Sequence, residues 1–160
     1  MVYALGSRAE TTAVPGAAEY AHTIADFEQA VRLRHRVAEI ASGGTLAVVG
    51  GGLTGVEAAA ELAESHPGLR VRLFTGAEDV GAGLSPRARR HLRHALDRLG
   101  IGVHPNTAVT AVRPDGLATR DGASFAADAV VWTAGFRVPG PATTASSSSP
   151  APTTARVPSC

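Results

Sequence analysis

Residues 45–57 read TLAVVGGGLTGVE, and this stretch decides the fold. The apolar run Leu46–Val49 predicts a buried strand, and Gly50, Gly52 and Gly55 follow it with the spacing GxGxxG. A helix is predicted to open directly after these glycines. A glycine fingerprint placed between a strand and a helix is typical of dinucleotide-binding sites. The sequence therefore predicts a βα unit that binds a dinucleotide.

Each glycine of this fingerprint has its own predicted task. Gly50 permits the tight turn, Gly52 lets the backbone approach a pyrophosphate, and Gly55 lets the helix pack closely on the strand. The N-terminus of the helix adds unpaired N–H groups and a positive dipole, which favour phosphates. The other predicted contacts in this loop are Gly51, Leu53 and Thr54. A glycine-rich connection without a ligand is the alternative interpretation.

From residue 45 onward the pattern alternates strand, helix, strand, helix, strand, which predicts a parallel sheet with crossover helices. The segments are residues 45–50, 55–66, 70–75, 85–100 and 101–105, the first helix opening at about Leu53. In the second helix, Ser85 is the predicted N-cap, Pro86 the first helical residue and Gly100 the stop. Its predicted buried face consists of Leu92, Ala95, Leu96 and Leu99.

Short β-prone segments at residues 108–112, 117–120 and around Phe125 follow, separated by turn dipeptides, and predict an antiparallel meander. The last predicted strand, residues 127–133, is apolar on both faces and therefore belongs inside the parallel sheet. The predicted fold class is α/β, a three-layer, Rossmann-like parallel sheet with a small antiparallel meander.

The first part of the chain predicts less regular structure. Val2–Ser7 is expected to form a short buried strand, and residues 8–16 a loop with Pro15 as a breaker. A long helix then starts between Glu19 and Ala25 and ends at residues 42–44. Its apolar stripe is predicted to comprise Ile24, Phe27, Ala30, Val31, Val37 and Ile40.

The other end, residues 138–160, is rich in Pro, Ala, Ser and Thr and shows no periodicity. Such a segment cannot bury enough apolar surface to offset the entropy of ordering it, so we expect it to be disordered. The folded body is therefore expected to end near residue 137.

Composition excludes several classes of protein. The chain has 160 residues, of which 44% are hydrophobic and 18% charged, and its formal net charge is +1. This profile is typical of one soluble domain and argues against a nucleic-acid binder. Neither a membrane span nor a secretory signal is predicted, so we expect a cytoplasmic location. The single cysteine, Cys160, offers no disulfide or CxxC chemistry.

The polar residues outside the fingerprint give weaker signals. The arginines of the second helix alternate with its apolar stripe, so a solvated face is expected: Arg87, Arg89, Arg90, Arg93 and Arg98. The six histidines have no metal-ligand spacing, and neither a metal site nor a catalytic residue is predicted. Glu57, two residues past Gly55, is either a helix-dipole partner in the first turn or a group near the ligand.

The end of the second strand bears on the choice of cofactor. An acidic residue about 20 residues past the fingerprint ordinarily hydrogen-bonds the ribose 2′-hydroxyl of NAD. Thr75 occupies that position here, and the nearest carboxylate, Glu78, lies in the loop beyond. No arginine directly follows the strand to bind a 2′-phosphate. NADH and NADPH both remain open.

The segments VYALGS, AVRLRHRV, TLAVVGGGLTGVEAAAEL, DRLG and ADAVVWTAGF, in this order, resemble the FAD-dependent pyridine nucleotide-disulfide oxidoreductases. Among these, type II NADH dehydrogenases and apoptosis-inducing-factor-like enzymes are the most similar. The resemblance covers about residues 2–137. It implies a domain for NAD(H) or NADP(H) inserted into an FAD domain, with hydride passing from the nicotinamide to the flavin and on to quinone or another acceptor.

The resemblance also implies roles for single residues. Gly50, Gly52 and Gly55 would hold the pyrophosphate, Thr75 would replace the ribose-binding acid, and Glu57 would face the nicotinamide end. Gly135 would lie beside the nicotinamide, where the chain returns to the FAD domain. Residues 1–41 are then expected to be a remnant of the FAD domain with its connecting helix, and residues 42–137 the NAD(P)H domain.

Two segments that the resemblance implies, the N-terminal FAD fingerprint and a second FAD-contacting segment, do not occur in these 160 residues. We therefore expect the chain alone to be incomplete and inactive, and to need a complementing FAD domain. A non-catalytic dinucleotide-binding fragment of a truncated gene is the alternative. Peripheral membrane association is expected only of an intact enzyme.

Overall fold

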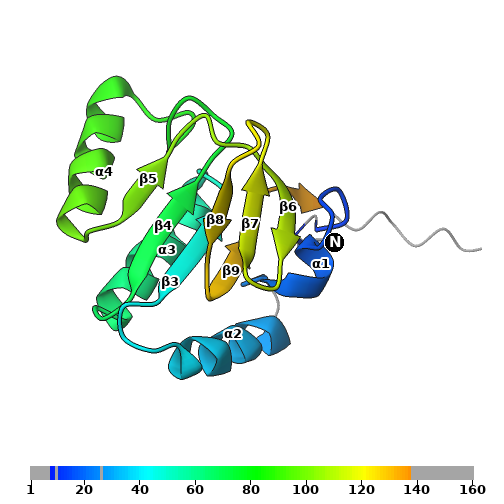
Figure 1. The fold of residues 1–160 in the computed structure, drawn as a ribbon. Coiled ribbons are helices and arrows are strands. Elements are labelled where there is room, and N and C mark those ends of the chain that lie inside the picture. Colours follow the sequence, from blue (N-terminus) through cyan, green and yellow to red (C-terminus); the bar gives the residue numbers. More distant parts are fainter. Residues whose placement is uncertain (1–7, 10, 26, 138–160) are drawn as a thin grey trace, which may run out of the picture.

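A computed structural model describes residues 8–9, 11–25 and 27–137 of the chain (Figure 1). The elements, in order, are β1 (Arg8–Ala9), α1 (Ala17–Tyr20), β2 (Ala21–His22), α2 (Phe27–Glu39), β3 (Thr45–Val49), α3 (Leu53–Ser65), β4 (Arg70–Phe74), α4 (Pro86–Arg98), β5 (Gly102–His104), β6 (Val109–Arg113), β7 (Gly116–Thr119), β8 (Ser124–Ala126), β9 (Ala129–Trp132) and β10 (Phe136–Arg137). The predicted strand at residues 2–7 and the predicted disorder at residues 138–160 lie outside the described residues.

The centre of the fold is a five-stranded parallel sheet with the order β2-β9-β3-β4-β5. All five residues of β3 are buried, and the apolar run Leu46–Val49 predicts this for an interior strand. β9 lies between β2 and β3, which confirms its predicted interior place. A second sheet, β6-β7-β8, is the predicted antiparallel meander.

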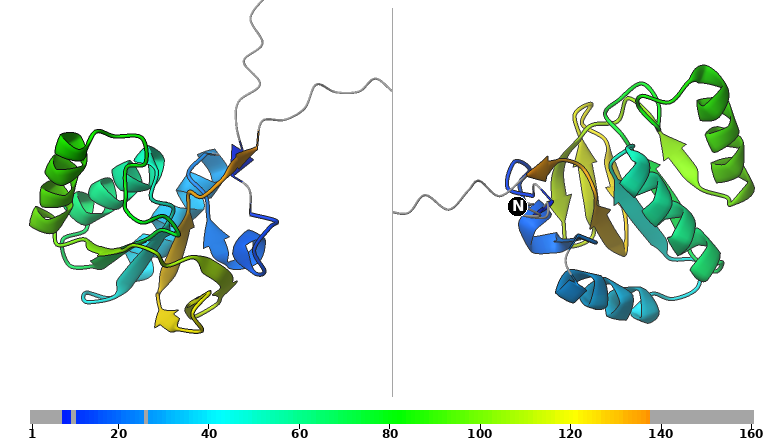
Figure 2. Two further views of the ribbon diagram at one scale, coloured as in Figure 1. Left: turned by 90° about the horizontal axis from the view of Figure 1, so that it is seen from above. Right: turned by 180° about the vertical axis from the view of Figure 1, so that it is seen from behind.

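Alternate residues of β3 separate two cores and so create three layers. Leu46 and Val48 pack with buried residues of α2, α3 and α4, whereas Ala47 and Val49 pack with α1 and the meander. The view from behind in Figure 2 shows α3 lying along the sheet, and Figure 1 shows the meander in front of β9. The predicted three-layer, Rossmann-like α/β fold is confirmed.

The termini of α4 follow the sequence closely. The Ser85 hydroxyl accepts a hydrogen bond from the backbone N–H of Ala88 at 3.3 Å, and Pro86 is the first helical residue. Past the end, Gly100 has φ +70°, the left-handed conformation of a helix stop. Leu96 is fully buried, and Leu92 and Leu99 pack against the same core. The predicted caps are thus confirmed. The predicted buried face is confirmed in part, because Leu92, Ala95 and Leu99 are half-buried and Ala95 is not among the residues packed on this core.

The prediction for residues 8–44 is partly wrong. In place of one long loop and one long helix, the chain forms β1, the short helix α1 and strand β2 before α2 begins at Phe27. Two-residue strands carry no recognisable periodicity; β1 exists because β10 pairs with it, and β2 because β9 does. The left view in Figure 2 shows β1 beside β10.

The apolar stripe of α2 also differs from its prediction. Leu33 and Val37 are the buried residues of this helix, whereas the side chain of Phe27 is 83% exposed. Arg36 fixes the helix to the sheet, since its Nη2 donates to the Asp128 carbonyl at 2.9 Å. Residues 21–39 therefore share the core of residues 45–132, and the domain boundary at residue 42 stays a prediction.

Candidate functional site

A cavity of about 440 Å³ lies where the carboxyl ends of β3, β4 and β9 meet. Parallel strands bring their carboxyl ends to one edge of a sheet, and this edge is where α/β folds bind ligands. The glycine loop, the residues after β4 and the residues after β9 all line it: Gly50, Gly51, Gly52, Thr75, Gly76, Thr133, Ala134 and Gly135. The fold thus brings together segments far apart in the sequence.

The glycine loop has the geometry that its sequence predicts. Gly50 has φ +127°, a conformation that side chains other than glycine rarely adopt. A Cβ added at Gly55 would lie 1.9 Å from the Gly50 carbonyl oxygen, so α3 can approach the loop only with glycine there. These two glycines shape the turn.

Gly52 is different, because a Cβ added there would meet no described atom within 4 Å. This residue lines the cavity and is also the N-cap of α3, where no side chain of the described part caps the helix. Uncapped amides and open space beside Gly52 suit an anionic group such as a pyrophosphate. The residues present therefore fit a dinucleotide.

Thr75 closes the end of β4. It is buried, and its hydroxyl oxygen accepts a hydrogen bond from the backbone N–H of Ala77 at 3.2 Å. A Cβ added at Gly51 would lie 2.5 Å from that same oxygen, so the threonine side chain packs directly under the glycine loop. Its hydroxyl stands where a ribose-binding carboxylate is common.

The end of β9 contributes two residues that the sequence analysis missed. The Thr133 hydroxyl is buried and donates to the Val49 carbonyl at 2.9 Å, which fixes the residue before Gly50. The Trp132 indole N–H donates to the Ala134 carbonyl at 2.8 Å, and Trp132 lines the cavity. Both residues belong to the segment ADAVVWTAGF, which the sequence analysis quoted for the resemblance. The polar residues at the end of its buried strand were the signal that could have identified them as site residues.

Five of the nine predicted site residues line the cavity: Gly50, Gly51, Gly52, Thr75 and Gly135. The other four, Leu53, Thr54, Gly55 and Glu57, lie on α3 outside its lining. Glu57 is exposed and is the fifth residue of α3, so its predicted place in the first helical turn is wrong. Contact of these nine residues with a dinucleotide stays a prediction.

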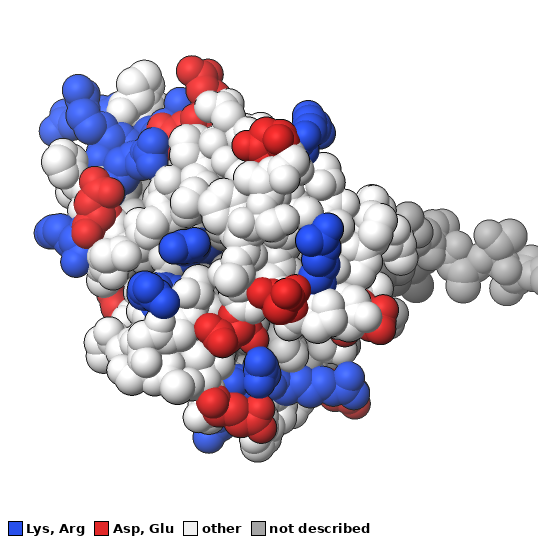
Figure 3. All heavy atoms as spheres, in the orientation of Figure 1, with Lys and Arg blue, Asp and Glu red and all other residues white. Residues whose placement is uncertain are grey.

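The arginines of α4 differ partly from the predicted solvated face. Arg87, Arg90 and Arg98 are exposed, but Arg89 and Arg93 are half-buried. Arg93 forms an ion pair with Asp79, the Nε–Oδ1 distance being 3.0 Å. Basic side chains gather over α4 at the upper left of Figure 3.

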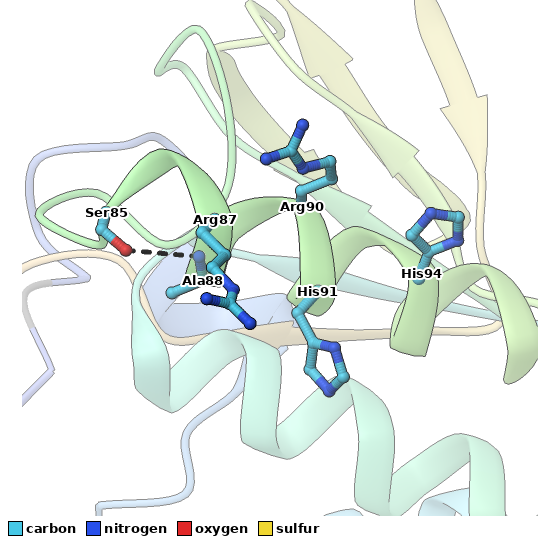
Figure 4. A pocket seen from close by; sticks show the side chains of 6 residues that line it. All are labelled: Ser85, Arg87, Ala88, Arg90, His91 and His94. Carbon is cyan, nitrogen blue, oxygen red and sulfur yellow. Dashed lines mark hydrogen bonds between the residues drawn. The ribbon is translucent and has the colours of Figure 1, made fainter.

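A second hollow, of about 630 Å³, lies along α4. Figure 4 shows Arg87 and His91 extending to one side of the helix and Arg90 and His94 to the other. Because these side chains come from one helix and diverge, they do not enclose a ligand. The cavity at the sheet edge is therefore the stronger candidate site.

Other chemistry is not evident in the described part of the chain. No three His, Cys, Asp or Glu side chains gather there as metal ligands. No described helix is long and apolar enough to cross a bilayer. His104 stacks on Phe74, which lines the cavity, with ring centroids 4.5 Å apart. Burial first, and then the Arg72 guanidinium, lower the pKa of this imidazole.

Comparisons with known proteins agree with this geometry. The profile of a family described as pyridine nucleotide-disulphide oxidoreductase matches residues 1–147. An NADH dehydrogenase-like protein of Mycobacterium tuberculosis is 34% identical over 152 residues, covering 86% of this chain and 38% of the relative. A type II NADH:quinone oxidoreductase of Haemophilus influenzae is 27% identical, covering 86% and 39%. The chain thus spans under two-fifths of the length of these curated relatives.

Solved structures share the fold. An FAD-dependent pyridine nucleotide-disulphide oxidoreductase from Desulfovibrio vulgaris superposes with TM-score 0.65 at 27% identity, covering 82% of this chain and 34% of that one. NDH2 from Plasmodium falciparum, in complex with NADH, gives TM-score 0.71 at 20% identity, covering 82% and 33%. An engineered water-forming NADPH oxidase bound to NADPH gives TM-score 0.70 at 18% identity, covering 82% and 29%.

Proposed function

Because this chain belongs to the pyridine nucleotide-disulphide oxidoreductase family, we propose that it is the NAD(P)H-binding part of a flavin-dependent oxidoreductase. The observation that carries the proposal is the cavity at the carboxyl edge of the sheet, where the glycine loop and the N-terminus of α3 meet. A pyrophosphate bound beside Gly52 would accept hydrogen bonds from uncapped helix amides.

The proposed contacts extend from the loop to the ends of β4 and β9. They are Gly50, Gly51, Gly52, Leu53, Thr54, Gly55, Glu57, Thr75 and Gly135. The bound dinucleotide would supply a hydride for transfer to FAD and on to quinone or another acceptor. The residues of this chain would bind and orient the dinucleotide, and buried Trp132 and Thr133 line the cavity together with Gly135.

The proposal assigns the flavin to a complementing FAD domain. The 160 residues contain one GxGxxG fingerprint, at residues 50–55, and the dinucleotide cavity uses it. We therefore expect the chain to bind NAD(P)H without any partner. It should oxidise NAD(P)H only when such a domain and FAD are supplied. A cytoplasmic location is proposed for the complex.

Trp132 provides a direct test of binding. It is the one tryptophan of the sequence and lines the cavity, so bound NADH, which absorbs where tryptophan emits, should quench its fluorescence. We expect saturable quenching by the wild-type chain. The variant Gly52→Ala should fold normally, because its Cβ meets open space, and should lose most of the quenching because the methyl group occupies the phosphate position.

Gly102→Ala on β5 is the matched control. A Cβ there would make only ordinary contacts, 3.7 Å or more from its neighbours, and the residue lies outside the cavity lining. It should bind NADH like the wild type. Folded wild-type protein that shows no saturable quenching, or Gly52→Ala protein that binds like Gly102→Ala, would contradict the proposed site.

A further inference from the structure

The end of the cavity at Thr75 has an uncharged wall. The described residues that line the cavity are apolar residues, glycines and threonines; none of them carries a charge. NAD-specific folds commonly place a carboxylate at the end of the second strand, where it binds the ribose hydroxyls and repels a 2′-phosphate. Thr75 carries no charge, so it supplies a hydroxyl in place of the carboxylate acceptor and does not repel a 2′-phosphate.

Backbone hydrogen bonds hold Thr75 and Ala77 in place. The Thr75 N–H donates to the His104 carbonyl at 3.0 Å, and the Thr75 carbonyl accepts from the Thr107 N–H at 2.7 Å. The Ala77 carbonyl accepts from the Asn106 N–H at 2.8 Å. Because Thr75 itself and Ala77 are both bonded to residues 104–107, another residue cannot take the position of Thr75.

The two acids that follow in the loop do not reach the cavity lining. Glu78 is exposed. Asp79 is already engaged, since its Oδ1 accepts from the Val80 N–H at 2.8 Å and pairs with Arg93 Nε at 3.0 Å. The loop therefore supplies no substitute for the missing carboxylate.

Resting on the proposed function, we propose that Thr75 determines cofactor choice and that this site accepts NADPH as well as NADH. The uncharged wall neither repels nor attracts a 2′-phosphate, which stays hydrated at the rim. Dissociation constants for the two dinucleotides are therefore expected to agree within about threefold, a small difference on the free-energy scale.

The experiment titrates the 160-residue chain with NADH and with NADPH at the same ionic strength, with Trp132 fluorescence as the readout. Both dinucleotides carry the same nicotinamide chromophore, so their quenching can be compared directly. Thr75→Glu restores a carboxylate and should weaken NADPH relative to NADH by about tenfold or more, through repulsion of the 2′-phosphate. Thr75→Asp is the smaller second variant, and thermal unfolding identifies variants that do not fold.

Glu78→Gln is the control for charge in the loop. It should leave the NADPH-to-NADH ratio within about twofold of the wild type, because Glu78 lies outside the lining. A wild-type preference for either dinucleotide of more than about tenfold overturns the inference, as does a ratio that follows Glu78 instead of Thr75. Loss of binding for both dinucleotides instead refutes the proposed function, so the two failures are distinguishable.

Discussion

Thr133 is bonded twice to Val49: its backbone N–H lies 2.8 Å and its hydroxyl oxygen 2.9 Å from the same Val49 carbonyl oxygen. This contact joins the end of β9 to the residue before the glycine loop. Cβ atoms added at Gly50 and Gly55 would lie 2.5 Å and 2.7 Å from the Thr133 hydroxyl oxygen. The side chain of Thr133 therefore packs against the glycine loop and fixes its first residues.

Replacing Thr133 by valine should destabilise the fold and weaken NADH binding. The valine keeps the shape of the side chain but removes the hydroxyl donor, which costs about 1 kcal/mol of unfolding free energy. Urea unfolding and Trp132 quenching measure the two effects. Thr133→Ser keeps the donor and should remain closer to the wild type. Equal stability of the valine and wild-type proteins would show that the hydroxyl is dispensable.

Gly55→Ala should lower the unfolding free energy by about 1–3 kcal/mol or more, because overpacking forces the backbone to shift. The added methyl group would collide with the Gly50 carbonyl oxygen at 1.9 Å. Gly52→Ala is the matched comparison and should stay within about 0.5 kcal/mol of the wild type. Thermal and urea unfolding measure the stability of both variants. If both variants unfold alike, the close approach of α3 to the loop does not constrain residue 55.

The sequence predicts the strand, glycine loop and helix at this edge of the sheet well, because the signals there are local. The strand before Gly50 and the helix after Gly52 are adjacent in the chain, and Thr75 ends the next strand. Thr133 reaches the site only because β9 is inserted between β2 and β3, a long-range pairing that local patterns do not encode. Phe27 shows the same limit: helical spacing placed it in the apolar stripe of α2, but the side chain is exposed.

Ser85→Ala should destabilise the chain without changing NADH affinity. The substitution removes the acceptor for the Ala88 N–H at the start of α4, and loss of such a cap costs about 1 kcal/mol. Ser85 lies outside the lining of the dinucleotide cavity. Ser85→Asp keeps an acceptor and should retain wild-type stability in urea unfolding. A changed dissociation constant for NADH in Ser85→Ala would instead link α4 to the binding site.

His104 should make the stability of the fold depend on pH. Burial and the Arg72 guanidinium lower its pKa below the ordinary 6.5, so the unfolded chain binds a proton more readily than the folded chain. The contribution of the neutral His104 side chain to the unfolding free energy is therefore fully present above pH 6.5. It declines as the pH falls below that value. His22, whose pKa is lowered by burial, Arg36 and Arg32, acts in the same direction.

His104→Phe separates the two histidines, because phenylalanine keeps a ring stacked on Phe74 but cannot titrate. Urea unfolding of both proteins at roughly pH 5.5 and pH 7.5, on either side of the histidine range, gives the change in free energy. We expect His104→Phe to lose less unfolding free energy on acidification than the wild type. The loss that remains in this variant should become smaller when His22→Gln is added. Identical losses in the wild type and His104→Phe would show that protonation of this stacked imidazole does not affect stability.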